Sequence, residues 1–320
     1  MSVTFQPGQR GDAPSRAVRD ATFAVHAGRI VGLVGESGSG KTATALALLG
    51  LHDLDVVEIG GSATFDGDEL LHRREEEMRR VRGARIGMVF QEPMTALNPL
   101  LPIGRQVDEV LRAHTDLGRA EVRQRVLEVL GEVGIPNPPQ RARAYPHQLS
   151  GGLGQRAMIA SAIACHPRLL IADEPTTALD VTLQAQILRL LRELVEREEM
   201  AVLLVTHDLA VVAESCDDVV VMYAGEVVET GTTAEVIGDP RHPYTRRLLA
   251  ARPRAGGWGH RLTPIPGRVP SATAERQGCA FRNRCDAAGP GCELPQALDD
   301  LAGGRRVRCC RARDPLASAS

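Results

Sequence analysis

Short apolar segments alternate with amphipathic segments along most of the chain. Several of the apolar segments have the length of buried strands, and they lie at 29–34, 62–66, 85–90, 168–173 and 201–206. The residues 218–231 predict a hairpin that turns at Ala224–Gly225. Because strands that alternate with helices are typical of α/β proteins, we expect an α/β sheet.

The amphipathic segments predict helices between these strands. A helix over 41–50 should follow the first long strand, and the stretch 92–165 is helical in its pattern. Within that stretch one helical face carries Val122, Val126, Val129, Leu130 and Val133. A later helix carries a stripe formed by Leu183, Ile187, Leu190, Leu191 and Leu194.

A change of composition after about residue 251 divides the chain. The segment that follows is rich in Gly, Pro and Arg, which is typical of a linker into a small terminal piece. We therefore expect one domain over 1–250, with a helical insertion at about 92–165, and a C-terminal extension over 251–320.

Composition narrows the class of protein. The 320 residues are 43% hydrophobic and 24% charged, which is ordinary for a globular protein, and a net charge of −2 argues against a nucleic-acid partner. No apolar run is long enough to cross a bilayer, and the N-terminus lacks the basic and apolar parts of a secretion signal. These features predict a cytosolic protein, in which the seven cysteines are not expected to form disulfides.

The only lysine of the sequence, Lys41, lies in a glycine-rich segment between an expected strand and an expected helix. The pattern G-x-x-x-x-G-K-[ST] of phosphate-binding loops is matched by Gly35, Glu36, Ser37, Gly38, Ser39, Gly40, Lys41 and Thr42. Glycines let backbone N–H groups surround a phosphate, and the helix N-terminus adds partial positive charge. A compact ammonium fits such a cavity, whereas the broad guanidinium of arginine does not. The alternative is a glycine-rich turn with a solvated lysine.

Two carboxylates at the end of the expected strand 168–173 suit magnesium chemistry. Asp173 would hold Mg²⁺ together with Thr42, and Glu174 would orient an attacking water. Solvated acids at a strand end are the simpler alternative. His207 follows the strand at 201–206 and would reach a terminal phosphate, although a histidine in such a place is more often structural.

A second anion site is predicted where Ser150, Gly151 and Gly152 open a helix. Free N–H groups and a hydroxyl point away from the positive end of that helix, but this site has no lysine of its own. Two half-sites on one chain predict a head-to-tail dimer that holds each nucleotide between two chains.

The order of these motifs resembles the ATP-binding cassette of ABC transporters, over about residues 1–250. The motifs are GESGSGKT, VFQEP with Gln91, LSGG, LLIADEP, TALD and His207. The resemblance implies an ABC-type P-loop nucleotide-binding domain with a RecA-like core, a β-subdomain and a helical subdomain. It also implies that the chain binds ATP with Mg²⁺ and hydrolyses it.

Individual residues receive roles from the same resemblance. Glu174 is similar to the catalytic base, His207 to the switch histidine, and Gln91 to the glutamine that approaches Mg²⁺ and the membrane partner. The Ser150–Gly152 segment is similar to the signature that contacts the nucleotide, and Asp180 to an aspartate at the dimer seam.

The adenine-stacking aromatic of the family has one candidate, Phe5. The family's first strand, which precedes this aromatic, is nearly absent from the sequence pattern. A simple edge-strand phenylalanine is an equally good interpretation of Phe5.

Further segments resemble the ATPases of oligopeptide and dipeptide permeases, and their D-type subunit more than the F-type. They are FQEPMTALNPLLPIGRQV, DEPTTALDVTLQAQIL and the region from HPYTRRLLAARP to LTPIPGRVPS. This resemblance implies a subunit that powers peptide import from the cytoplasmic face of the plasma membrane. Its partners would be two membrane permease subunits, a second ATPase subunit of the same or another kind and, indirectly, an external peptide-binding protein.

Other functions stay open at this point. One alternative keeps the transporter but changes its cargo to nickel, to another small solute or to an exported peptide. A soluble ABC ATPase acting on DNA or ribosomes usually carries coiled-coil arms or tandem cassettes, which this sequence lacks. A non-hydrolysing regulatory cassette is disfavoured by the presence of Glu174 and His207.

Five cysteines lie between residues 279 and 310. Four of them are candidate ligands of a metal ion or cluster that would stabilise this short segment, namely Cys279, Cys285, Cys292 and Cys309. The resemblance implies a C-terminal cysteine motif that holds a [4Fe–4S] cluster in some members. Five and six intervening residues favour a cluster over zinc, and free thiols are the third interpretation. Nearby arginines would offset thiolate charge or are simply solvated, namely Arg282, Arg284, Arg305, Arg306 and Arg308.

Overall fold

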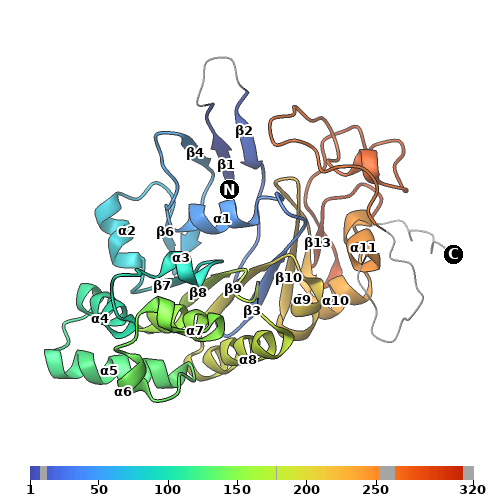
Figure 1. Ribbon diagram of the computed structural model, residues 1–320. Coiled ribbons are helices and arrows are strands. Elements are labelled where there is room, and N and C mark those ends of the chain that lie inside the picture. Colours follow the sequence, from blue (N-terminus) through green and yellow to red (C-terminus); the bar gives the residue numbers. More distant parts are fainter. Residues whose placement is uncertain (8–12, 178, 252–263, 313–320) are drawn as a thin grey trace. The chain divides into compact units, whose positions relative to one another are not determined.

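The structure is a computed structural model, shown in Figure 1, and it describes residues 1–7, 13–177, 179–251 and 264–312. The chain divides into two compact units. The first unit comprises Met1–Ala24, Gly32–Leu71 and Thr206–Ser320, and the second comprises Val25–Val31 and His72–Val205. The strand β3 (Ile30–Val34) crosses from the second unit into the first.

A three-stranded antiparallel sheet lies at the N-terminal end of the first unit. In it β1 (Ser2–Phe5) pairs on one side with β2 (Ser15–Val18) and on the other with β4 (Val57–Gly60). The expectation that this first strand is nearly absent is therefore wrong, because four residues suffice when both edges have a partner. The strand expected over 62–66 is reduced to β5 (Thr64–Phe65), paired with β6 (Asp68–Glu69).

The second sheet of the first unit contains the predicted hairpin, which is confirmed. It runs through β10 (Asp218–Tyr223) and β11 (Glu226–Thr232), and Ala224 and Gly225 have positive φ angles of 49° and 88°. Two positive φ angles match the right-handed twist of the flanking strands. From the C-terminal end of the chain, β13 (Arg306–Val307) pairs with β11, and β12 (Asp299–Asp300) pairs with β13.

Short helices complete the first unit. The helix expected over 41–50 is α1 (Lys41–Leu48), which ends two residues earlier than expected. The other helical elements are α9 (Leu209–Ser215), α10 (Thr233–Gly238), α11 (Pro243–Ala250), η2 (Arg282–Arg284) and η3 (Ala302–Gly304). Part of the expected linker, residues 252–263, lies outside the described residues.

Parallel strands form the centre of the second unit, as the apolar runs predict. They are β7 (Ile86–Val89), β8 (Leu169–Asp173) and β9 (Ala201–Thr206), with β8 in the middle. Every residue of β8 and β9 is buried, which is typical of parallel strands. Because parallel strands end at the same edge of a sheet, Asp173 comes to the carboxyl edge, where ligands of α/β proteins bind.

The helical stretch expected at 92–165 consists of several separate helices, and Figure 1 shows α4 to α7 grouped together in the second unit. They are α3 (Pro93–Ala96), α4 (Ile103–His114), α5 (Arg119–Glu132), α6 (Pro138–Arg141), η1 (Pro146–Gln148) and α7 (Gly151–Ile163). The remaining helices are α2 (Glu75–Val81) and α8 (Val181–Glu198). The predicted apolar stripes of α5 and α8 are buried, except that Leu183 is half-buried. No helix in the described ranges has both the length and the apolar character needed to span a bilayer.

Candidate functional site

The predicted phosphate loop joins β3 to α1 in the first unit. A Cβ atom on Gly35 would lie 2.1 Å from the carbonyl oxygen of Met222, so only glycine fits at this position. Ser37 and Gly38 are exposed at the tip of the loop, whereas Ser39 is buried. The backbone N–H of Gly225 donates to the carbonyl oxygen of Ser39 at 3.0 Å, which ties the loop to the hairpin turn.

Lys41 is the first residue of α1 and is only 5% exposed. Its Nζ donates hydrogen bonds to the carbonyl oxygens of Gly35 at 2.9 Å and Glu36 at 3.1 Å. The loop thus surrounds the ammonium, which donates to neutral carbonyl oxygens. A hydrogen bond from the same ammonium to an anionic oxygen would be stronger. The alternative of a solvated lysine in an ordinary turn is wrong, because this side chain is buried.

Three other candidates belong to the first unit. Thr42 is exposed in the first turn of α1. The ring of Phe5 lies edge-on to His52, with ring centroids 5.5 Å apart. His207 is exposed and directly follows β9. The next residue, Asp208, caps the N-terminus of α9, and its carboxylate accepts the backbone N–H of Ala210 at 2.6 Å.

The second unit contains the two predicted acids. Asp173 ends β8 and is 3% exposed, so the alternative of a solvated acid is wrong for this residue. Glu174 has a positive φ of 47°, a conformation that is uncommon for a residue with a side chain and that clusters at functional sites. Its carboxylate accepts hydrogen bonds from Gln91 Nε2 at 3.1 Å and from Thr177 Oγ1 at 2.9 Å. The structure therefore brings Gln91 and Glu174 together, although 83 positions separate them in the sequence.

Thr177 is a site residue that the sequence analysis missed. Its backbone N–H donates to the carbonyl oxygen of Glu174 at 3.1 Å, which closes a turn directly after the strand. The signal in the sequence was a hydroxyl residue three positions after the acid, which is typical of such turns.

The predicted second anion site lies at the N-terminus of α7. Ser150 caps this helix by accepting the backbone N–H of Leu153 at 3.4 Å, and Asp180 caps α8 by accepting that of Leu183 at 2.9 Å. A Cβ atom on Gly152 would lie 2.9 Å from Leu183 Cδ1, so the two helix N-termini approach each other closely at this glycine. Gly151 is exposed, which leaves the start of α7 open to a ligand.

The cysteines of the C-terminal segment are free thiols, and all of them lie in the described ranges. Burial, with smaller contributions from neighbouring cysteines, raises the pKa values of Cys279 and Cys285 to about 11. Cys309 is shifted in the same direction for the same reason. In the described part of the chain, no group of three or more His, Cys, Asp or Glu residues is arranged to hold a metal ion. The thiols as they are placed therefore do not fit a bound metal ion.

The arginines around these cysteines pair mostly with carboxylates. Three of the pairs are Arg284–Glu36, Arg305–Glu229 and Arg308–Asp20. Because these three arginine side chains are at most 11% exposed, the interpretation that they are simply solvated is wrong. The sequence did not reveal the pairs, because their carboxylates lie 76 to 288 positions away along the chain.

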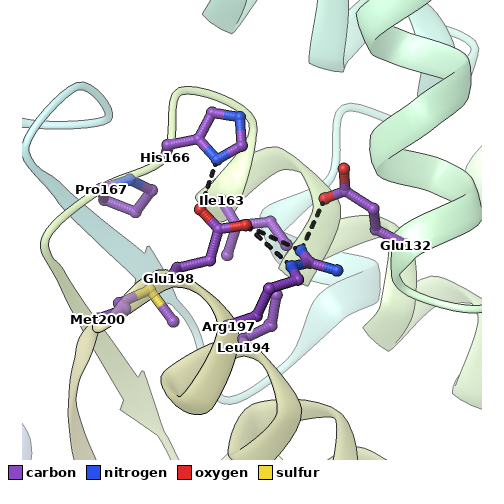
Figure 2. Close-up of a pocket in the computed structure, with 8 residues that line it drawn as sticks. All are labelled: Glu132, Ile163, His166, Pro167, Leu194, Arg197, Glu198 and Met200. Carbon is purple, nitrogen blue, oxygen red and sulfur yellow. Dashed lines mark hydrogen bonds and ion pairs between the residues drawn. The ribbon is translucent and has the colours of Figure 1, made fainter. Parts of the chain in front are cut away.

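A small pocket elsewhere in the second unit is lined by a chain of ion pairs (Figure 2). The Glu198 carboxylate lies between His166 Nδ1 at 2.8 Å and Arg197 Nε at 3.0 Å, and Arg197 also reaches Glu132 at 3.3 Å. None of the candidate site residues lines this pocket.

Comparison with protein families gives two matches on different parts of the chain. The model of the ABC transporter family matches residues 18–177. The model described as "Oligopeptide/dipeptide transporter, C-terminal region" matches residues 228–292.

Curated proteins are similar over nearly the whole length. "Dipeptide transport ATP-binding protein DppD" of Escherichia coli (strain K12) is 48% identical over 298 residues, which are 93% of this chain and 91% of that protein. "Probable D,D-dipeptide transport ATP-binding protein DdpD" of the same strain is 48% identical over 304 residues, which are 95% and 92% of the two chains.

Solved structures share the fold. The one titled "Dimeric Structure of MJ0796, a Bacterial ABC Transporter Cassette" has a TM-score of 0.63 and 29% identity, and the match covers 72% of this chain and 98% of that one. The structure of cbiO1 from Clostridium perfringens, "Part of the ABC transporter complex cbiONQ", has a TM-score of 0.61 and 26% identity, with coverages of 74% and 90%.

Proposed function

The chain belongs to the ABC transporter family of ATP-binding proteins, and from this premise we propose that it is the ATP-hydrolysing subunit of a peptide importer. The observation that carries the proposal is that one chain matches both the ATPase family and the C-terminal region of oligopeptide/dipeptide transporters. Its fold is that of an ABC ATPase, which uses ATP and Mg²⁺.

The residues support distinct steps of ATP hydrolysis. The buried ammonium of Lys41 and the N–H groups of its loop would bind the phosphates, and Asp173 and Thr42 are the residues that would hold Mg²⁺. Glu174 accepts a proton from the attacking water, since its carboxylate is fixed by two donors at the end of a strand. Gln91 donates one of these bonds, so it would lie close to a water that Glu174 orients.

We propose further contacts for the nucleotide and its terminal phosphate. Phe5 stacks on adenine, and His207 contacts the terminal phosphate. The start of α7, with Ser150 and Gly151, binds the same phosphate from a second chain, and Asp180 lies at the seam. ATP binding therefore closes a dimer of ATPase subunits, and hydrolysis opens it again.

The remaining partners follow from the peptide-importer branch. We propose that two ATPase subunits, alike or different, dock on two permease subunits at the cytoplasmic face of the inner membrane. An external peptide-binding protein would deliver the cargo. The expected domain division, 1–250 and 251–320 with a helical subdomain at about 92–165, also stays a proposal.

A [4Fe–4S] cluster, or zinc, on Cys279, Cys285, Cys292 and Cys309 stays a prediction from the resemblance. The placement of the thiols does not support it, because in the described ranges they are not arranged as a metal-binding group. A brown anaerobic preparation whose visible absorption is lost in Cys279→Ser would support the cluster, whereas a colourless, iron-free protein would refute it.

Purification of the tagged chain from membranes tests the proposed function. We expect two permease subunits to co-purify. A knockout should lose uptake of labelled dipeptides, and the wild-type chain should restore this uptake whereas Lys41→Arg should not. Normal dipeptide uptake with lost nickel uptake in the knockout would indicate another cargo. Absence of membrane partners would indicate a soluble ABC ATPase instead.

A further inference from the structure

One residue of the cysteine-bearing segment contacts the phosphate loop directly. Arg284, which immediately precedes Cys285, is 8% exposed. Its NH1 donates to both carboxylate oxygens of Glu36, at 3.2 and 3.1 Å, and to the hydroxyl of Tyr223 at 3.2 Å. The loop and the arginine belong to the same compact unit, although 248 positions separate them.

Glu36 is the second residue of the phosphate loop and is fixed at three points. Its backbone N–H donates to the hydroxyl of Tyr244 at 2.9 Å, and its carbonyl oxygen accepts from Lys41 Nζ at 3.1 Å. Its carboxylate is held by Arg284. When Lys41 turns from this carbonyl to a phosphate, Glu36 keeps the contacts with Tyr244 and Arg284, and its carbonyl oxygen still accepts the backbone N–H of Ser39 at 3.1 Å.

The arginine itself is held rigidly. Its Nε donates to the carbonyl oxygen of Pro266 at 2.8 Å, and its guanidinium carbon lies 5.7 Å from the ring centre of Tyr223 and 5.9 Å from that of Phe281. Tyr223, Tyr244 and Phe281 are each at most 1% exposed and pack with centroids 4.6 to 5.4 Å apart. A guanidinium with so little freedom transmits its own position to the group that it binds.

We propose that Arg284 is a positioning residue of the nucleotide site, which neutralises Glu36 and fixes the phosphate loop in its binding conformation. The inference rests on the proposed function of this loop as the ATP site. A carboxylate in a loop that surrounds phosphates repels them unless a cation compensates it. The cysteine-bearing segment is then a structural part of the ATP site.

The charge argument makes a rescue experiment decisive. In the full chain, Arg284→Met leaves the charge of Glu36 uncompensated and should weaken binding of fluorescent ATP roughly tenfold. In the ATPase assay the effect should appear mainly in KM. Adding Glu36→Gln to Arg284→Met removes the repelling charge and should restore most of the affinity. Arg284→Lys, which keeps the charge but loses the fork, should lie between Arg284→Met and wild type.

Arg282→Met is the matched control, since Arg282 is exposed on the same short helical turn, η2. Thermal unfolding of each variant verifies that it is folded. Unchanged ATP affinity in Arg284→Met, or a loss that Glu36→Gln does not reduce, overturns the inference while leaving the ATPase intact. Failure of the wild-type chain to bind ATP overturns the proposed function as well.

Discussion

Residues 41 and 174 show how a single position selects a side chain. Lys41 is enclosed by the carbonyl oxygens of its own loop, and a compact ammonium satisfies them where a planar guanidinium would not fit. Glu174 occupies a strained backbone conformation, and its carboxylate is aimed by Gln91 and Thr177. In both cases neighbouring groups hold the charged end of the side chain in place.

Glu174→Gln tests the proposed role of Glu174 as general base. The amide keeps the size of the side chain but cannot accept a proton, so ATP turnover should fall roughly a hundredfold to ten-thousandfold while ATP still binds. The variant should remain as a closed ATP-bound dimer, which size-exclusion chromatography with ATP would detect. Full turnover in this variant would show that another group is the base.

At the scale of elements, a buried ion pair joins the C-terminal segment to the hairpin. Arg305, next to β13, pairs with Glu229 of β11, whose carboxylate also accepts the backbone N–H groups of Arg241 at 2.7 Å and His242 at 3.0 Å. Glu229 is fully buried. Removing one partner of such a pair strongly destabilises the fold, because the remaining charge is buried away from water and has no counter-ion.

Arg305→Met should lower the free energy of unfolding by about 3–5 kcal/mol, because it leaves Glu229 buried without its cation. Urea denaturation measures the difference. Arg306→Met is the control, since its partner Asp300 is exposed and an exposed pair contributes less than about 1 kcal/mol. Equal losses in the two variants would contradict this account of the pair.

The helix α8 ends in a contact that depends on pH. Burial would raise the pKa of Glu198, but hydrogen bonds from His166 and Arg197 outweigh it and hold this pKa below the ordinary 4.5. A depressed pKa stabilises the fold above the ordinary value, and the contribution disappears as pH falls through the folded-state pKa. Since His166 is half-exposed, the contribution is less than about 1 kcal/mol.

Glu198→Gln should therefore destabilise the protein slightly at about pH 7 and not at all well below pH ~4. Chemical denaturation over this range measures the difference from wild type. Glu196→Gln, at an exposed position of the same helix, is the control for replacing a carboxylate by an amide. A difference for Glu198→Gln that persists at low pH would mean that packing, and not the carboxylate charge, is lost.

At the scale of the whole molecule, the C-terminal segment completes the first unit. Phe281 packs on Tyr223 and Tyr244. Three arginines of the segment bind carboxylates of the same unit, which lie between β2 and β3, in the phosphate loop and in the hairpin. The segment contributes two strands to the same sheet as the hairpin.

A chain that ends at residue 251 should consequently be destabilised by about 5 kcal/mol or more, since it loses a buried aromatic and a buried cation. Thermal unfolding measures this, with a chain ended at residue 312 as the control because it keeps the described contacts. An unchanged melting temperature would support the division at residue 251 that composition alone predicts.

The sequence by itself determined the elements and motifs that depend on neighbouring residues. The strands β3, β8 and β9, the hairpin turn and the phosphate loop were all predictable, because apolar period, glycine and charge act over a few positions. Tertiary structure alone decided the partners of the arginines, the pairing of Gln91 with Glu174 and the double pairing of β1. Such contacts join residues far apart in the chain, and burial, which no local pattern records, selects them.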